Sequence, residues 1–499
     1  MHEQAMAIEM LQIREAGEIR EIKKDIVKIE GLSNCMNGEL LDITSRAKGL
    51  VMGFTENGAL ALLLGTCEDA KVGDKVYSKR EPFTIPVGRG FLGRIVNALA
   101  EPVDGKGPVT EDSTNPNADH YPVFRDAPSV LERIPITEVF ETGILIIDAT
   151  IPIGKGQRQL IIGDRMTGKT TICVDAILNQ KGKNVVCIYC CIGRAQSSLQ
   201  NIVETFKAKG ALDYTIVVSA SASASVGEQY LAPYTACTLG EYFMDSGKDV
   251  FVVFDDLTKH AWAYRQLSLL LERSPGRDAY PGDIFYLHSQ LMERAAKLSP
   301  EHKGGSMTFF PIVDTLQGDI TGYIPSNLVS MTDGQIYLNT ALFSGGFKPA
   351  VDLGLSVSRV GNKVQCPAMK ELSGMLRLEY LQYNELLRMT RFKASISEET
   401  AQRLKHGAVI TGLFMQDRNE PYSREGQIIF LYALGKNVLD ALSEEAIKCF
   451  KKEIFDFAKR EFPSVIEDLS LKLKLTGEIL KGLDECLIRF FRSKDLERI

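Results

Sequence analysis

The chain has 499 residues, 44% of them hydrophobic, and its 58 lysines and arginines against 64 aspartates and glutamates give a net charge of −6. This length predicts about three domains, and the negative balance argues against a nucleic-acid-binding protein. No apolar run is long enough to span a bilayer and no secretory signal begins the chain, so the 10 cysteines are expected to be reduced thiols.

The N-terminal part is predicted to be mostly β-structure. We expect a short helical segment at residues 1–16 and a small β-domain at residues 17–88. Two short apolar runs flank Asn57 and Gly58, and this pair is a strong hairpin signal because both residues tolerate positive φ. Short strands with glycine turns indicate a barrel or a sandwich.

Residues 89–362 are predicted to form an α/β domain that binds a nucleotide. The segment 163–170 reads GDRMTGKT and fits the phosphate-binding loop (P-loop) pattern G-x-x-x-x-G-K-[ST], with an apolar strand before it and a helix after it. In such a loop backbone N–H groups surround the phosphates, the lysine reaches the outer phosphates and the final hydroxyl holds Mg²⁺. The predicted nucleotide-binding residues of the loop are Gly163, Asp164, Arg165, Met166, Thr167, Gly168, Lys169, Thr170 and Thr171, and Thr170 is also a predicted magnesium ligand.

A second, acidic motif supports this prediction. The apolar run Asp249–Phe254 has the composition of a buried parallel strand and leads into Asp255 and Asp256, at the carboxyl end where α/β sheets bind ligands. In P-loop NTPases an aspartate at this place orients magnesium and its waters. We therefore predict a magnesium role, through water, for Asp255, and a turn or a structural hydrogen bond for Asp256.

From residue 363 to residue 499 the chain is predicted to be a helical domain. Apolar side chains recur at helical spacing on one face, namely at Met369, Leu372, Leu376, Tyr380, Tyr383 and Leu387. Ser395 with Glu398 matches a capping box, and further helices are expected at 436–460 and 463–492.

Several segments carry a resemblance to one family. They are 85–94, 102–107, 151–158, the Asp-Arg-x-Thr wording of 164–167, 229–234, 274–283, 332–336 and 356–361. Over nearly the whole chain, the sequence resembles the alpha subunit of the F-type ATP synthase head. The resemblance implies a multidomain β + α/β + α fold, with an N-terminal six-stranded-type β-barrel, a central RecA-like P-loop α/β domain and a C-terminal helical bundle.

The resemblance also implies a function. In this family alpha and beta subunits alternate in a three-plus-three ring around a gamma shaft, and alpha binds Mg-ATP without hydrolysing it. Alpha contributes an arginine to the catalytic site of the neighbouring beta subunit; here this corresponds to Arg359, with Ser356 in the same interface segment. A guanidinium supplied in trans stabilises the charge of the transferring phosphoryl group. The residues that lie beside the adenine in the family correspond to Gln416 and Arg418.

The implied complex is a membrane-attached rotary ATPase that makes or consumes ATP while it transports H⁺ or Na⁺. The chain is then expected to be a peripheral subunit on the cytoplasmic face of a bacterial plasma membrane, with ATP and Mg²⁺ as cofactors, no nucleic-acid partner, and membrane contact only through the complex. The segment before the barrel is shorter than is usual in the family, which leaves contact with the stator subunits delta and b open. The coupling ion is chosen by other subunits.

Some positions depart from the family pattern. The strand after the P-loop helix ends in Ile192–Ala195, without the carboxylate that positions attacking water in a catalytic beta subunit. Two places for Arg194 stay open at this point, beside the phosphates or in solvent. Met166 and Arg418 stand where the family usually has glutamine.

Two other classes of protein share this core fold. A self-sufficient homohexameric export-type ATPase is the main alternative, but it should keep a glutamate near Gly193, and none is present. An RNA-translocating hexamer should show a basic channel and an RNA-binding small domain, and the predicted barrel lacks clusters of aromatic and basic residues. The non-catalytic alpha subunit is therefore the preferred prediction.

Overall fold

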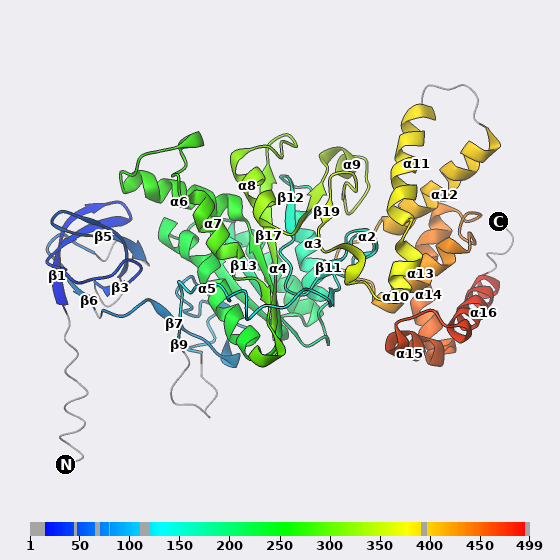
Figure 1. The fold of residues 1–499 in the computed structure, drawn as a ribbon, viewed down its shortest axis with the longest axis horizontal. Coiled ribbons are helices and arrows are strands. Elements are labelled where there is room, and N and C mark those ends of the chain that lie inside the picture. The colour runs from blue at the N-terminus through cyan, green and yellow to red at the C-terminus, as the bar shows by residue number, and fades with distance from the viewer. Residues whose placement is uncertain are drawn as a thin grey trace, which may run out of the picture. The chain divides into compact units, whose positions relative to one another are not determined.

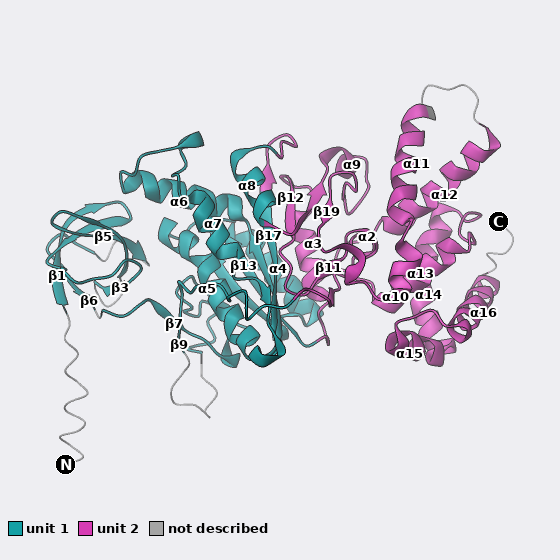
Figure 2. Ribbon diagram, in the orientation of Figure 1, with its two compact units in different colours: residues 1–134, 184–313, 321–331 teal, residues 135–183, 314–320, 332–499 magenta. Residues whose placement is uncertain are grey.

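The computed structural model describes residues 15–43, 47–64, 70–78, 80–109, 120–390 and 397–494. The chain forms two compact units (Figure 2): unit 1 comprises residues up to 134, 184–313 and 321–331, and unit 2 comprises 135–183, 314–320 and the chain from 332 onward. The predicted N-terminal helical segment lies, up to residue 14, outside the described residues. Its last two residues, Glu15 and Ala16, begin the first strand instead.

Unit 1 begins with a closed six-stranded β-barrel, which confirms the barrel implied by the resemblance (Figure 1). Its strands are β1 (Glu15–Lys23), β2 (Ile26–Glu30), β3 (Leu40–Asp42), β4 (Lys48–Thr55), β5 (Gly58–Leu64) and β6 (Lys75–Ser78). They are joined in the order β1-β2-β5-β4-β3-β6. Alternate side chains point inward. The resulting apolar core includes Ile19, Val27, Leu41, Val51, Ala61 and Val76.

The β4–β5 hairpin lies where the sequence predicts it, but its turn comes one residue earlier. Thr55 pairs with Gly58, so Glu56 and Asn57 form the turn. Gly58 is needed for a different reason, because a Cβ at this position would lie 2.0 Å from the carbonyl oxygen of Ile29 on the neighbouring strand.

The rest of unit 1 is built around parallel strands in the order β17-β15-β13-β14-β8. These strands are β8 (Ile95–Val96), β13 (Val185–Ile192), β14 (Thr215–Ala220), β15 (Asp249–Asp255) and β17 (Ser306–Thr315), and the smaller ones are β7 (Thr84–Pro86), β9 (His120–Pro122) and β16 (Ala296–Lys297). The helices are α4 (Gln196–Lys209), α5 (Val226–Asp245), α6 (Leu257–Leu270), α7 (Ile284–Met292) and α8 (Tyr323–Met331). Every residue of β13 is buried, as expected for a parallel strand covered on both faces, and α5 packs against β13, β14 and β15.

Unit 2 contains the P-loop strand and its neighbours. The strands β12 (Leu160–Asp164), β18 (Gly334–Leu338) and β19 (Val357–Ser358) lie in the order β19-β18-β12, with β12 and β18 parallel and β18 and β19 antiparallel. A small pair is formed by β10 (Val139–Phe140) and β11 (Ile153–Gly154), and the helices of this part are α2 (Leu145–Thr150), α3 (Lys169–Leu178) and α9 (Thr340–Ser344).

The C-terminal part of unit 2 is helical, as predicted (Figure 1). Its helices are α10 (Pro367–Ser373), α11 (Leu376–Thr390), α12 (Glu398–Phe414), α13 (Arg424–Gly435), α14 (Glu444–Glu461), α15 (Pro463–Lys472) and α16 (Gly477–Ser493). Helices α11 and α12 pack against each other, and α12 packs on α14. None of the helices in the described ranges is long and apolar enough to cross a membrane.

Helix boundaries in this part differ from the predictions in several places. The N-cap of α12 is Ser397, whose side chain accepts a hydrogen bond from the Thr400 N–H, whereas the predicted cap Ser395 lies outside the described residues. The helix predicted at 436–460 begins later, with Ser443 as the N-cap of α14. The segment predicted as one helix at 463–492 is two helices, because Leu473 adopts a left-handed φ of 53° and ends α15.

The predicted apolar face near residue 369 is also divided between two helices. Met369 lies on α10, and Leu376 and Tyr380 lie on α11; all three are buried. Leu387, in the last turn of α11, is exposed. The apolar periodicity therefore predicts the buried residues correctly in α10 and the first half of α11, but not at the end of α11.

Candidate nucleotide-binding site

The P-loop of unit 2 has the strand–loop–helix geometry that its sequence predicts. Strand β12 ends at Asp164 and α3 begins at Lys169. Between them Met166 and Gly168 adopt positive φ values of 64° and 98°. Thr167 donates a hydrogen bond of 2.8 Å to the Asp164 carbonyl oxygen, which closes the loop. The N-terminus of α3 therefore begins directly after the loop, as a phosphate site requires.

The Asp164 carboxylate anchors the loop to the rest of unit 2. It accepts hydrogen bonds from the hydroxyls of Thr315 (2.6 Å) and Thr340 (2.9 Å) and from the Gly318 N–H (2.8 Å). Burial acts to raise the pKa of Asp164, but these three donors outweigh it and lower the pKa. The side chain is thus an ionised acceptor that holds the loop in place, which gives a structural reason for aspartate at a variable position of the motif.

Lys169 directs its ammonium group back toward the loop. Its Nζ lies 2.8 Å from the Gly163 carbonyl oxygen, 2.5 Å from the Asp164 carbonyl oxygen and 3.0 Å from Oδ1 of Asp314. The same Asp314 forms a 3.3 Å ion pair with the more exposed Arg165. Two cations are therefore gathered at the entrance to α3, and both form ion pairs with Asp314.

Asp314 is a functional candidate that the sequence reasoning missed. It lies near the end of β17, after the apolar run Met307–Val313. This is the same signal that identified Asp255, a carboxylate at the carboxyl end of a buried parallel strand. A search for a carboxylate at the carboxyl end of every predicted strand of the domain would have identified both Asp255 and Asp314.

The other predicted P-loop residues differ in exposure. The Met166 side chain is 90% exposed, so it makes little contact with its own unit and is accessible to a ligand or a partner. Thr170 and Thr171 are half-buried in the first turn of α3, and the magnesium role predicted for Thr170 stays a prediction.

Asp255 and Asp256 end β15 in unit 1 and have different partners. The Asp256 side chain caps α6 by accepting a 2.7 Å hydrogen bond from the Lys259 N–H, which is the structural role predicted for it. Asp255 is fully buried, and its Oδ2 accepts a 2.6 Å hydrogen bond from the Tyr189 hydroxyl. The guanidinium of Arg194 forms an ion pair with the same oxygen.

Arg194 therefore forms an ion pair within unit 1 that the sequence did not predict. Burial acts to lower the pKa of this guanidinium, but the adjacent Asp255 charge outweighs it and raises the pKa, so Arg194 stays a cation. The magnesium role predicted for Asp255 stays a prediction.

Arg359 and Ser356 belong to the segment around β19, an edge strand within unit 2. The Arg359 side chain is exposed, and no residue in the described part of the chain forms a hydrogen bond or ion pair with its guanidinium. Its backbone N–H donates to the Asp333 carbonyl oxygen at 2.8 Å, and the Asp333 carboxylate is held by Arg158 through Nε at 3.0 Å and Nη2 at 2.9 Å. The backbone is thus fixed while the guanidinium projects outward.

Ser356, in contrast, is fully buried. Its hydroxyl donates to the Asp352 carbonyl oxygen at 2.6 Å and accepts from the Tyr337 N–H at 2.9 Å. Both partners are backbone groups of unit 2. This side chain holds the segment that carries Arg359. The catalytic role that the resemblance implies for Ser356, together with Arg359, stays a prediction.

Gln416 and Arg418 lie in the loop between α12 and α13. The Gln416 amide donates to the carbonyl oxygens of Gly143 (2.9 Å) and Glu420 (2.8 Å) and accepts from the Leu145 N–H (3.2 Å). Both of its N–H groups are occupied by backbone. The Arg418 side chain is exposed, and the next residue is tied to the P-loop helix, because the Asn419 N–H donates to Asp175 of α3 at 2.7 Å.

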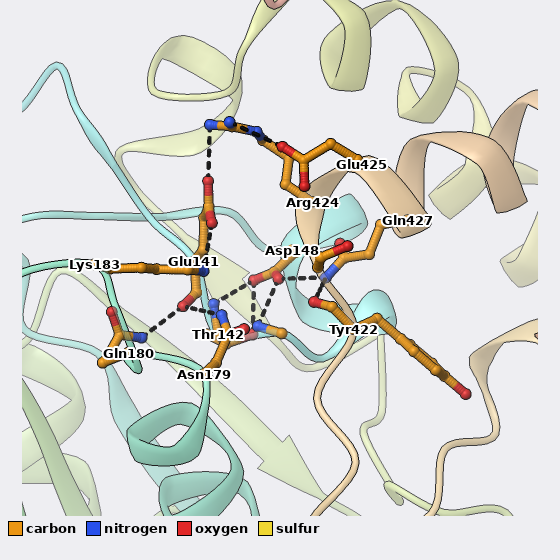
Figure 3. A network of polar contacts seen from close by, with 12 residues as sticks. Glu141, Thr142, Asp148, Asn179, Gln180, Lys183, Tyr422, Arg424, Glu425 and Gln427 are labelled. Atoms are coloured by element: carbon orange, nitrogen blue, oxygen red, sulfur yellow. Dashed lines mark hydrogen bonds and ion pairs between the residues drawn. The ribbon is translucent and has the colours of Figure 1, made fainter. Parts of the chain in front are cut away.

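A buried polar network supports this loop (Figure 3). Asp148 of α2 lies at its centre and accepts hydrogen bonds from the N–H and hydroxyl of Thr142, from the Gly143 N–H and from the side chain of Gln427 on α13. Burial raises the pKa of Asp148, against the opposing effect of these donors. The network joins the segment before the P-loop strand to the helical part of unit 2, and it therefore fixes where Arg418 stands relative to α3.

Comparisons with known proteins agree with this architecture. Residues 143–358 match the ATP synthase alpha/beta family, nucleotide-binding domain, and residues 365–490 match the ATP synthase alpha/beta chain, C terminal domain. The ATP synthase subunit alpha of Clostridium botulinum strain Eklund 17B is 46% identical over 476 residues, which cover 95% of this chain and 93% of the relative. That of strain Hall is 47% identical over the same lengths. The chain therefore belongs to the ATP synthase alpha/beta family, among its alpha subunits.

Proposed function

We propose that this chain is a non-catalytic, ATP-binding alpha subunit of a membrane-attached rotary F-type ATP synthase. In this proposal three copies alternate with three beta subunits around a gamma shaft, and the complex couples ATP synthesis or hydrolysis to H⁺ or Na⁺ transport at the cytoplasmic face of the membrane. The observation that carries the proposal is an intact P-loop in a chain whose next strand is followed by Arg194 in its turn instead of by a carboxylate.

The chain is expected not to hydrolyse ATP because of the residue type that follows strand β13. Hydrolysis needs a group that accepts a proton from the attacking water, and a guanidinium has only donors. The carboxylate that Arg194 contacts, Asp255, has its charge compensated and already accepts from Tyr189. Loss of general-base assistance costs about 10²- to 10⁴-fold in rate, so the chain's own site is expected to hold ATP without cleaving it.

The triphosphate is assigned to the P-loop of unit 2. Backbone N–H groups at the start of α3, together with Lys169 and Arg165, supply the donors and the positive charge for it. Magnesium bound with the nucleotide would neutralise part of the phosphate charge, and the Thr170 hydroxyl is the group of this loop that would hold it. Arg418 is exposed and is available to contact the base, whereas the committed amide of Gln416 supports the loop.

Arg359 is assigned to the catalytic site of the neighbouring beta subunit. An exposed guanidinium on a fixed backbone at a sheet edge is suited to reach a ligand held by another chain. There its planar fork can span two oxygens of the transferring phosphoryl group. Contacts with the stator subunits delta and b stay open in this proposal.

The proposal is tested with the full-length chain, alone and mixed with beta and gamma subunits. ATP binding is measured by calorimetry, phosphate release by a coupled assay, and assembly by analytical ultracentrifugation. We expect ATP binding with background phosphate release from the chain alone, and a three-plus-three ring only with beta. A stable homohexamer that releases phosphate over many turnovers would instead support the export-type ATPase.

A further inference from the structure

Lys451 of α14 is a buried lysine of unit 2 that has no part in the site described above. Its side chain is only 7% exposed, whereas lysines are rarely buried without a partner. Its Nζ donates hydrogen bonds to the carbonyl oxygens of Gly412, at 2.7 Å, and of Met415. Both acceptors are backbone groups at the end of α12, so the ammonium group joins α14 to the segment that follows that helix.

The end of α12 needs these donors, because the last carbonyl oxygens of a helix have no N–H groups ahead of them. Met415 is the C-cap residue, where the backbone becomes extended with a ψ of 122°. In a continuing helix the Gln416 N–H would bond to the Gly412 carbonyl oxygen, but here it donates to the Lys348 carbonyl oxygen at 2.8 Å. Lys451 supplies the missing donors, and its positive charge is favourable at a helix C-terminus.

The segment that Lys451 holds leads directly to Arg418. Gln416 is bonded through its side chain to three backbone groups of unit 2. The Asn419 N–H donates to Asp175 of the P-loop helix at 2.7 Å. Arg418 is therefore an exposed side chain between two fixed residues, and Lys451 fixes the backbone at the start of the same segment.

We propose that Lys451 is a positioning residue for nucleotide binding, which holds the segment 415–419 so that Arg418 meets the base of the bound ATP. The inference depends on the proposed function, because it takes the P-loop as the triphosphate site and Arg418 as the group at the base. It assigns a role in ATP binding to a residue of α14 that acts only through another side chain.

The protonation of Lys451 gives a second way to disturb this arrangement. Burial lowers the pKa of Lys451 to about 8, Lys448 and Lys452 on the same helix act in the same direction, and Asp417 of the held segment acts against them. Above this pH the neutral amine keeps two N–H groups, but its hydrogen bonds lose the assistance of the charge and become weaker. The segment should therefore be held less firmly as the pH rises from 7 to 9.

The test is a double-mutant cycle on the full-length chain, with ATP binding measured by calorimetry at pH 7 in excess Mg²⁺. Arg418→Ala should weaken binding about tenfold, the size of a contact between a guanidinium and an aromatic ring. Lys451→Met should weaken binding about three- to tenfold in the parent chain, but less than about twofold when Arg418 is already alanine. Lys459→Met removes an exposed lysine of the same helix and should leave the affinity unchanged.

Two results of the cycle would overturn the inference. One is an equal loss of affinity from Lys451→Met with and without Arg418, which would mean that the lysine supports the fold in general. The other is an Arg418→Ala chain that binds ATP as the parent does, while Lys169→Ala still weakens binding; the P-loop site would then stand without this inference. Failure of the parent chain to bind ATP would instead overturn the proposed nucleotide site.

If Lys451→Met does not fold, the pH dependence decides. The affinity of the parent chain is compared with that of Arg418→Ala at the same pH, so that the titration of ATP itself cancels. The advantage of the parent should shrink about threefold between pH 7 and pH 9, as Lys451 loses its proton. A constant advantage over this range would overturn the inference.

Discussion

The P-loop of unit 2 and the end of β15 in unit 1 hold their charged side chains in opposite ways. Lys169 divides its ammonium contacts among two backbone carbonyl oxygens and the Asp314 carboxylate. We expect phosphate oxygens to compete with these partners for the ammonium group when ATP binds. The Oδ2 atom of Asp255 contacts the Tyr189 hydroxyl and the Arg194 guanidinium, which come from the adjacent strand β13 and the turn after it. The contacts of Lys169 are thus mainly with backbone oxygens, whereas those of Asp255 include an oppositely charged side chain.

The difference reflects what each region is made of. A P-loop binds phosphate mainly through backbone N–H groups, so a change such as methionine for glutamine at residue 166 leaves most of its donors in place. The end of β15 carries the buried carboxylate of Asp255, and Arg194 in the turn after the neighbouring strand forms an ion pair with it.

Of the substitutions considered, we expect the largest loss of ATP turnover from a change at Arg359, which lies in neither of these two regions. Arg359→Lys keeps the charge but loses the planar fork that spans two phosphate oxygens. Multisite ATP turnover of the assembled complex should fall by about a hundredfold or more, scaled down from the loss of a whole arginine finger. Steady-state phosphate release by the reconstituted ring measures this.

A matched control for this prediction is Lys363→Gln, which removes an exposed cation four residues along the same segment. Turnover of that variant should stay within about threefold of the parent, since an exposed charge of this kind contributes little. ATP binding by the chain alone should be unchanged by Arg359→Lys. Normal turnover in the Arg359→Lys ring would mean that this arginine is structural.

The substitution Lys169→Ala tests whether the P-loop lysine binds the phosphates of ATP. Without the ammonium, the phosphates lose a charged donor, and such a hydrogen bond contributes about 1.5–3 kcal/mol. ATP affinity of the full-length chain should therefore fall by about ten- to a hundredfold. Calorimetry in Mg²⁺ measures the change, and Lys181→Ala, which removes an exposed lysine after α3, is the control. Equal affinity in the Lys169 variant and the parent would mean that ATP binds elsewhere.

The two regions also differ in how far the sequence predicted them. The P-loop was predictable because its pattern fixes backbone geometry, and the parallel strand of Asp255 was predictable from its apolar run. The partner of Arg194 was not, because the contact depends on which strand lies beside β15 and on the register that sets Cys191 opposite Asp255. Neither can be read from spacing along the chain.

The same limit applies to the other site residues. Ser356 and Gln416 were assigned by family position, but their hydrogen bonds go to backbone groups that tertiary structure brings to them, at Tyr337 and Asp352 and at Gly143 and Leu145. In the helical part, the periodicity indicated helices but not where they end. The break at Leu473 is a single left-handed residue with no glycine to signal it.

We expect the stability of unit 1 to depend on pH, because two histidines are buried near the end of β15. One of them lies on α6, the helix that follows Asp255 and Asp256. His260 of α6 and His288 of α7 are fully buried, with ring centroids 5.8 Å apart. Burial lowers the pKa of His260 to about 4 and that of His288 to about 3. In the unfolded chain histidine titrates near about 6.5. Between these values the unfolded chain binds more protons, so the stability of unit 1 should fall as the pH falls from about 6.5 toward 4.

The expected size is up to about 1.4 kcal/mol for each pH unit and each histidine. Trp262, the single tryptophan of the chain, lies on α6 two residues from His260, so its fluorescence follows this region during urea unfolding. His288→Gln should reduce the pH dependence, and His302→Gln, at a more exposed histidine, should not. An unfolding midpoint that does not change between neutral pH and pH 5 would contradict a neutral buried pair.

The smallest effect is expected at Asp314, and it tests whether the contacts of Lys169 are in fact exchangeable. Asp314 is the carboxylate that Lys169 and Arg165 share. If phosphate oxygens replace it when ATP binds, Asp314→Asn removes both a competitor for Lys169 and a negative charge near the phosphates. Because such a partly exposed charge interaction is modest, ATP affinity should rise by only about three- to tenfold.

Asp319→Asn removes the same charge from an exposed position five residues along, and it should leave the affinity nearly unchanged. Calorimetry at low and high salt separates the two, since only the effect of Asp314 should persist when exposed charges are screened. Weaker binding in the Asp314 variant would show that the carboxylate positions Lys169 for the phosphates and does not compete with them, and the P-loop would then be as fixed as the end of β15.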